Sequence, residues 1–398
     1  MHSKTVLITN TTTGAGLVAA RSLAAAGYRV MTVDFPCLPL GLRSRYSTSD
    51  HAVPGWKQSE FEEGSLDLLD RLRPDVYLPI GTRYVYFAAK HRGRLPGGTA
   101  VNVPSLDGFM AAYIKSVCIA ECRSLGIACP QDYSFEQAGS LLAEDRGATV
   151  VVKPDSDIGA ASGIRFVRDR ASLRGAVAQC DAQFGRTLIE EYIPGGAEAM
   201  KTVVLLFSRE SRLAAAFTTR KIRQWPATGG LTAVSRSTDE ECLVRLVLPF
   251  FEKWRWRGSA EVELKFDARD GRHKVVEINP RFPGYLRFAV QCGLDLPLLA
   301  AGLALGDETG CTRVYPAYRT GARYVNPALF FRTVASGLRR TGVGELRRAL
   351  RDMRGLGSAV TYLLKDPLPL AGRALRRLGR VHESRRLFQV PREELPRS

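Results

Sequence analysis

The chain has 398 residues, of which 45% are hydrophobic and 24% are charged. These proportions are typical of a soluble globular protein with room for two or three domains, and no apolar run reaches the roughly 18 residues that a membrane span requires. The N-terminus passes directly into the strand pattern Val6-Leu7-Ile8 without signal-peptide features, so we expect a cytoplasmic protein. Eight cysteines without CxxC pairs or histidine partners argue against disulfides and a zinc site.

The net charge of +17 is concentrated near the C-terminus. Residues 332–398 contain 16 Lys and Arg against six Asp and Glu. This composition favours a solvated helical surface, and the alternative is a contact with an acidic partner or an anionic membrane surface. We expect no nucleic-acid partner.

The first 105 residues show the pattern of a small doubly wound sheet. A buried strand at 6–9, a helix ending at Gly27 and a second strand at 28–34 make a βαβ start, and further strand and helix patterns follow between 66 and 91. Gly14, Gly16 and Asp34 match the dinucleotide-binding fingerprint, which keeps an NAD(P)-dependent oxidoreductase as one alternative. The second alternative is a Rossmann-like domain that binds no dinucleotide, because three threonines lengthen the loop before the glycines.

Two lysines and a small-residue loop follow. Lys115 lies in a helix pattern at 110–125, and Lys153 lies at the end of a strand pattern at 149–154. The next loop, at 155–163, contains Gly159, Ser162 and Gly163, whose backbone N–H groups can approach phosphate oxygens closely, and a strand at 164–167 closes the hairpin. The alternative is a flexible hairpin without a ligand.

A third motif begins at the strand pattern 187–195. Glu190, Tyr192 and Ile193 lie in this pattern and Glu198 follows it, an arrangement that can contact an adenine edge and ribose hydroxyls. A further strand at 214–219 leads to Arg220 and Arg223, which we expect to gather anionic groups unless they form a solvent-facing strand end.

A predicted hairpin at 261–279 carries the strongest candidate for a metal site. Alternation places Glu263 on one face of the first strand, and Glu277 and Asn279 share a face of the returning strand beyond the Asp270-Gly271 turn. Two carboxylates and an amide carbonyl suit Mg²⁺, which takes few protein ligands, and Arg281 adds donors for a phosphate or carboxylate. The alternative is a hairpin with a polar solvent face.

The order and spacing of these motifs over residues 5–330 resembles the ATP-grasp superfamily, and more narrowly its predicted ATP-dependent carboxylate–amine ligases. The resemblance implies a mixed α/β (α+β) fold in three parts. A Rossmann-like domain covers 1–105, and an ATP-grasp domain of two α+β subdomains covers 106–325 with its lid at about 130–195. A basic helical extension covers 326–398.

The resemblance also implies ATP and Mg²⁺, for which Mn²⁺ can substitute, and small-molecule carboxylate and amine substrates. The implied activity joins the carboxylate to the amine through an acyl phosphate, with release of ADP and phosphate. A departure from similar sequences is Thr218-Thr219, where they often carry a histidine. The alternatives are a nucleotide-binding module without ligase activity and a phosphoryl acceptor that is not a carboxylate.

Residue roles follow from the same resemblance. Lys115 and Lys153 would hold the α and β phosphates under the 155–163 loop, in which Gly159, Ser162 and Gly163 lie. The adenine would contact Glu190, Tyr192 and Ile193, and the ribose Glu198. The metal ligands would be Glu263, Glu277 and Asn279, and the catalytic cations Arg281, Arg220 and Lys153, with Arg223 beside them.

Overall fold

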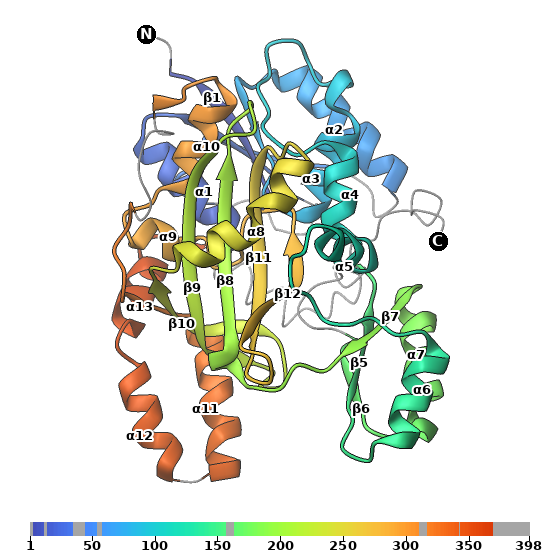
Figure 1. Cartoon of the computed structure of the whole chain (residues 1–398). Helices are drawn as coiled ribbons and strands as arrows, with labels where there is room; N and C mark the ends of the chain where they lie inside the picture. The colour runs from blue at the N-terminus through green and yellow to red at the C-terminus, as the bar shows by residue number, and fades with distance from the viewer. Residues whose placement is uncertain are drawn as a thin grey trace.

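Three β-sheets organise the part of the chain that the computed structural model describes, which is residues 3–11, 14–34, 44–53, 58–156, 163–309, 317–341 and 343–368 (Figure 1). One sheet is parallel and two are antiparallel, so the predicted mixed α/β fold is confirmed. Every helix among these residues is too short or too polar to span a lipid bilayer.

The N-terminal sheet has the strand order β3-β2-β1-β4, with all neighbours parallel. Its strands are β1 (Thr5–Thr9), β2 (Arg29–Asp34), β3 (Ser49–Ala52) and β4 (Val76–Leu78). The helical elements are α1 (Gly14–Ala25), α2 (Gln58–Leu72), α3 (Thr82–Lys90) and the 3₁₀ turn η1 (Arg92–Arg94). Helices cover both faces, which explains the continuous apolar run in β1.

Close packing explains one glycine of the dinucleotide-like turn. A Cβ on Gly16 would lie 2.4 Å from the backbone oxygen of Asn10, so α1 reaches the loop after β1 only if this position lacks a side chain. A Cβ on Gly14 would meet nothing closer than the Gly284 oxygen at 3.6 Å. Close packing therefore accounts for glycine at position 16 without a bound cofactor.

The central sheet is antiparallel, with six strands in the order β12-β11-β8-β9-β10-β13. Its strands are β8 (Met200–Phe207), β9 (Leu213–Trp225), β10 (Leu231–Thr238), β11 (Gly258–Asp267), β12 (Arg272–Asn279) and β13 (Arg323–Val325). Strand β9 is longer than the predicted 214–219 and includes Arg220 and Arg223. The predicted Asp270-Gly271 turn is present, with Gly271 at a φ of 70°.

The two faces of this sheet have different neighbours. One face packs on α8 (Glu241–Lys253), where Val203 and Val262 meet Phe250 in a core cluster. The other face packs on the N-terminal unit and on α9 (Arg287–Gln291) and α10 (Leu296–Ala304), with Val204 and Phe217 in that cluster. Because side chains alternate along β8 and β11, which pair without a register shift, odd and even residues of these two strands lie on different faces.

A smaller antiparallel sheet, which we call the lid, projects to the side of the central sheet (Figure 1). Its strands are β5 (Val150–Pro154), β6 (Arg165–Val167) and β7 (Thr187–Glu191), in the order β6-β5-β7. Two helices, α6 (Phe135–Glu144) and α7 (Arg170–Phe184), pack on it around Val150 and Leu173. Gly159 and Ser162 lie outside the described residues, whereas Gly163 begins the return at a φ of 85°.

The single helix predicted at 110–125 is wrong, because the structure has two helices there. Helix α4 (Leu106–Tyr113) ends at Ile114, whose backbone is extended, and α5 (Lys115–Ser124) begins at Lys115. The cause is tertiary: Asp155 accepts hydrogen bonds from the Ser116 backbone nitrogen at 2.7 Å and from the Ser116 hydroxyl at 2.8 Å. The end of the lid strand thus caps α5 and fixes the position of Lys115.

The described residues from 327 to 368 are mainly helical, as expected. Its helices are α11 (Pro327–Thr341), α12 (Val343–Asp352) and α13 (Leu356–Leu364). These three helices lie within the helical extension expected for 326–398, of which residues 369–398 lie outside the described residues. The short 3₁₀ turn η2 (Ala197–Ala199) links the lid to β8.

Candidate functional site

The β11–β12 hairpin places four oxygen-bearing side chains in two directly opposed pairs. Glu263 pairs in register with Glu277, and Glu261 pairs with Asn279. Directly opposed residues of antiparallel strands point to the same face with their Cβ atoms about 5 Å apart. The predicted set Glu263, Glu277 and Asn279 therefore lies together, and Glu261 joins it.

Two lysines from outside the central sheet reach this face. Lys115, the first residue of α5, lies 3.3 Å from a Glu277 carboxylate oxygen, and Lys153 of the lid donates to the Val276 carbonyl at 3.4 Å. Lys153 also lies 2.7 Å from a carboxylate oxygen of Glu190, and both side chains are 4% exposed. The structure thus brings Lys115, Lys153, Glu190 and Glu277 into one charged cluster.

The carboxyl of Glu190 is deeply buried in that cluster. Desolvation by burial raises its pKa, and the nearby Lys153 and Lys115 act in the opposite direction. Its second oxygen has no hydrogen-bond partner among the described residues. A buried acceptor with spare capacity beside two lysines is typical of a site that takes a polar ligand.

A third lysine, which sequence reasoning did not assign to the site, completes the cluster. Lys221 of β9 lies 3.0 and 3.1 Å from the two carboxylate oxygens of Glu263 and is 2% exposed. Alternation along the strand could have indicated Lys221, because it lies two residues after Thr219, which is on the same face of the sheet as Glu263.

The expectation for Arg220 and Arg223 is corrected by the structure. Arg220 is opposite Lys201, which is opposite Leu264, so Arg220 points to the α8 face, away from Glu263. Arg223 forms buried ion pairs with Glu345 and Asp352 of α12. Arg223 is held by the carboxylates of α12 and Arg220 faces away from Glu263, so neither side chain is placed beside the opposed glutamates.

Arg281 connects the hairpin to the N-terminal unit. Its guanidinium donates to Asn279 Oδ1 at 3.0 Å, to Glu261 at 3.3 Å and to the Thr82 hydroxyl at 3.1 Å. Burial, together with the nearby Glu263, raises the pKa of Glu261 to about 7, and Arg281 opposes this shift. Glu261 and Thr82 are further residues of the candidate site that no sequence motif indicated.

Of the residues expected at the adenine and ribose, Glu190 lies in the charged cluster with Lys153, whereas Tyr192 and Glu198 lie near Lys265, towards the other end of the hairpin face. Lys265 Nζ is 5.3 Å from the centre of the Tyr192 ring. Burial lowers the pKa of Lys265, and the nearby Glu198 carboxylate acts in the opposite direction. Ile193 is buried and Glu198 is exposed. Tyr192, Glu198 and Lys265 thus form a group between the lid and the central sheet.

Two cavities lie away from the opposed glutamates. One, of about 420 Å³, includes Pro194, Glu198, Lys201, Arg220 and His273 in its lining. The other, of about 540 Å³, lies between α9 and the start of α13, and its charged lining residues are Arg319, Arg323 and Arg354.

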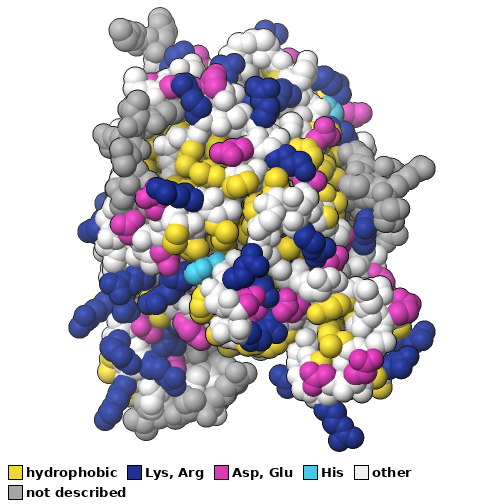
Figure 2. Space-filling view, viewed as in Figure 1, with side chains coloured by type: hydrophobic (Ala, Val, Ile, Leu, Met, Phe, Trp, Pro, Cys, Tyr) yellow, Lys and Arg dark blue, Asp and Glu magenta, His cyan; other side chains and the backbone are white. Residues whose placement is uncertain are grey.

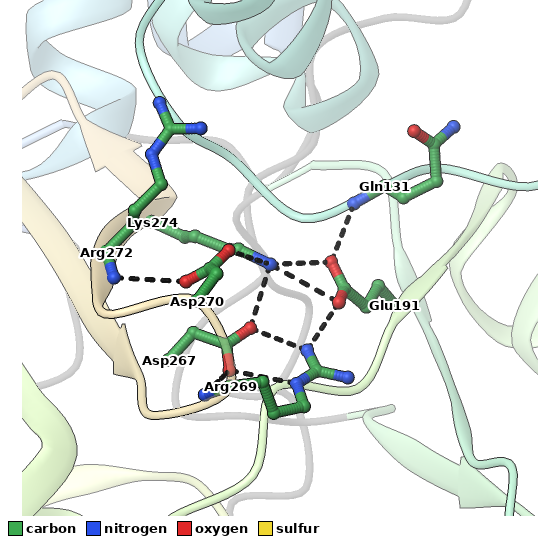
Figure 3. A network of polar contacts seen from close by, with 7 residues as sticks. All are labelled: Gln131, Glu191, Asp267, Arg269, Asp270, Arg272 and Lys274. Carbon is green, nitrogen blue, oxygen red and sulfur yellow. Dashed lines mark hydrogen bonds and ion pairs between the residues drawn. The ribbon is translucent and has the colours of Figure 1, made fainter.

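An ion-pair network holds the base of the lid against the hairpin (Figure 3). Glu191, next to Glu190, binds Lys274 at 3.1 Å and Arg269, and accepts from the Gln131 backbone nitrogen at 3.2 Å. Asp267 binds Lys274 at 2.8 Å and also binds Arg269. The hydrogen bonds from Arg269 and Lys274 hold the pKa of Asp267 well below its usual range. The lid is therefore anchored at its base, beside the cluster that contains Lys153.

The donor set suits a hard cation. Within the described part of the chain no group of three or more His, Cys, Asp and Glu side chains is arranged to hold a metal. A cation at this hairpin would have the carboxylates of Glu263 and Glu277 and the amide of Asn279, with its remaining ligands from a substrate. This is the coordination that Mg²⁺ prefers, and the three lysines balance the carboxylates in the structure.

Comparison with solved structures identifies the fold as ATP-grasp. The biotin carboxylase domain of the Hydrogenobacter thermophilus 2-oxoglutarate carboxylase, solved with MgADP, ADP and bicarbonate, is 16% identical with a TM-score of 0.63, over 81% of this chain and 74% of that one. An L-amino acid ligase from Bacillus licheniformis is 16% identical with a TM-score of 0.59, over 79% and 78%. The N5-carboxyaminoimidazole ribonucleotide synthetase PurK, solved with ADP, is 14% identical with a TM-score of 0.60, over 82% and 80%.

The resemblance to the ATP-grasp superfamily is confirmed at the level of the fold. No protein-family model matches the chain, and no curated protein sequence is significantly similar to it. At these identities, the likeness leaves the reaction and its substrates to be argued from the site.

Proposed function

We propose that this protein is an ATP- and Mg²⁺-dependent ligase that joins a carboxylate to an amine through an acyl phosphate and releases ADP and phosphate. The observation that carries the proposal is the opposed pair Glu263 and Glu277, surrounded by Lys115, Lys153, Lys221 and Arg281. Oxygen ligands for a cation and several cations for phosphates, on one face, are what phosphoryl transfer between two anions requires.

The cations of the site act first. Lys115 and Lys153 bind the α and β phosphates, and each already lies beside a carboxylate that orients its side chain. Arg281 and Lys221 offset the charge of the γ-phosphate as a substrate carboxylate attacks it. Mg²⁺ held by Glu263, Glu277 and Asn279 would neutralise phosphate oxygens during the transfer.

The second step needs no protein nucleophile. The substrate amine displaces phosphate from the acyl phosphate, and an amide forms. The lid covers the reacting groups and excludes water, so that the amine reacts with the acyl phosphate before water can hydrolyse it. Tyr192, Ile193 and Glu198 hold the adenosine at the base of the lid, where Lys265 lies against Tyr192.

The test is release of ADP and phosphate from Mg-ATP with a pooled panel of amino acids, other carboxylic acids and amines, followed by mass spectrometry. We expect release that requires both a carboxylate and an amine, and a product lighter by one water than their sum. Release with the amine alone would contradict a carboxylate acceptor.

Calorimetry on the same sample distinguishes the alternatives. Mg-ATP binding without turnover on any panel member would favour a nucleotide-binding module. Binding of a dinucleotide and not of Mg-ATP would favour the oxidoreductase that Gly14, Gly16 and Asp34 suggested, although Gly16 already has a packing reason.

A further inference from the structure

The outer surface of α11–α13 exposes large apolar side chains at helical spacing. On α12 and just beyond it, Leu346, Leu350 and Met353 recur every three or four residues and are 50%, 61% and 41% exposed. The same kind of stripe occurs on the neighbouring helices: its members are Phe331 and Leu338 on α11, and Val360 and Leu364 on α13. Side chains of this size are rarely exposed in series on a surface that contacts only water.

The charges of the same segment are sorted between its two sides. Residues 327–368 contain three acidic residues, Glu345, Asp352 and Asp366, and all three are buried. They are paired with the body of the protein: Glu345 with Arg223, Asp352 with Arg223 and Arg323, and Asp366 with Arg21. These contacts dock the helices with their acidic groups facing inward.

The outward charges of this segment are all basic. The exposed cations are Arg332, Arg339, Arg347, Arg348, Arg351, Arg354 and Lys365. On α12, Arg347, Arg351 and Arg354 follow the apolar stripe one position later, so a basic row lies beside an apolar row. Figure 2 shows Lys and Arg side chains gathered at the end of the molecule where Figure 1 places α11 and α12.

We propose that α11–α13 bind the surface of an anionic lipid membrane, with their apolar rows inserted between the lipids and their arginines on the headgroups. An acidic protein would satisfy the arginines, but would leave Leu350 and Leu364, 61% and 69% exposed, without an apolar partner. A lipid surface satisfies both rows at once, because arginine side chains extend from an apolar layer to its charged boundary. The contact is peripheral, since no described helix could span the bilayer.

The experiment is sedimentation of the full chain with vesicles of phosphatidylcholine alone or with added phosphatidylglycerol. We expect binding to the anionic vesicles, weakened by salt, and little binding to the neutral ones. Leu350→Glu and Leu364→Glu should each lower the partition coefficient by at least about tenfold. The double variant Arg351→Glu/Arg354→Glu should do the same.

Matched controls carry the same chemical changes elsewhere. Leu298→Glu on α10, where the leucine is 37% exposed, and Arg94→Glu/Arg146→Glu should bind vesicles like the parent chain. Thermal unfolding tests whether each variant is folded. If Leu350→Glu is not folded, Leu364→Glu alone tests the apolar row.

Several results would overturn the proposal. One is absence of binding to anionic vesicles at low salt, and another is binding that the α11–α13 variants and the controls affect equally. Sedimentation velocity that shows self-association abolished by Leu350→Glu would assign the surface to a second copy of this chain. Binding of polyglutamate that depends on Arg351 and Arg354 and not on Leu350, without vesicle binding, would assign it to an acidic polypeptide.

Discussion

Glu263 and Glu277 are directly opposed on β11 and β12, and each carboxylate is paired with a lysine from a different part of the chain. Lys221 comes from the same sheet, whereas Lys115 comes from the start of a helix that the lid caps. Two neighbouring carboxylates repel each other unless cations lie between them. In the proposed function, the two carboxylates would exchange these lysine contacts for a metal ion, and the lysines would contact phosphates.

Replacement of Glu277 by Gln should abolish turnover and leave the fold intact. The substitution keeps the shape and removes the charge that would hold the cation, so we expect a loss of roughly 100-fold or more in the rate of ADP release. Glu241→Gln, an exposed change on α8, is the matched control. Full amide formation by Glu277→Gln would refute this assignment.

Lys221 and Arg220 are neighbours on opposite faces of β9, and they give a paired test of the site. Lys221→Met should lower ligase activity by roughly tenfold or more, because it removes the partner of Glu263, while Arg220→Met should have a much smaller effect. Lys221→Arg should recover part of the activity. Equal losses in the two methionine variants would show that the face assignment is wrong.

Glu261 should make the stability of the fold fall as pH rises. Its pKa is raised from the ordinary value of 4.5 to about 7 by burial, so between these values the folded state binds more protons than the unfolded state. This contribution is complete below pH 4.5 and is lost as pH rises through 7. Chemical unfolding across this range should show a shallower dependence in Glu261→Gln, and an unchanged slope relative to the parent chain would contradict the shift.

The two glycines of the N-terminal turn should differ in their tolerance of a methyl group. Gly16→Ala should cost about 1–3 kcal/mol of unfolding free energy, because the new Cβ would lie 2.4 Å from Asn10, whereas Gly14→Ala should be nearly neutral. Denaturant unfolding of both variants measures the difference. A similar cost at both positions would mean that close packing is not what selects glycine at 16.

Arg223 should be important for stability and not for chemistry. Arg223→Met leaves Glu345 and Asp352 without this buried partner and should cost about 3–5 kcal/mol, with the activity of the folded fraction retained. Arg245→Met, at an exposed pair with Glu241, is the control and should change stability little. Loss of activity without loss of stability would return Arg223 to the candidate site.

Local pattern was sufficient for much of this protein. Alternation and turn residues predicted the β11–β12 hairpin with Glu263, Glu277 and Asn279 on one face, and the spacing of apolar residues predicted the parallel N-terminal sheet. Both depend on neighbours in sequence, since side chains two apart in a strand share a face. The order of these motifs was enough to predict the ATP-grasp fold that the comparisons show.

Contacts between distant residues decided the rest. The helix at 110–125 breaks at Ile114 because Asp155, far along the chain, caps a new helix at Lys115, and nothing near Ile114 in sequence signals this. Arg223 and Lys221 both lie on β9, but Arg223 binds the C-terminal helix α12 whereas Lys221 binds Glu263 in the candidate site. Long charged side chains bind whichever partners the packing of sheets and helices places near them, so their roles were decided by the tertiary structure.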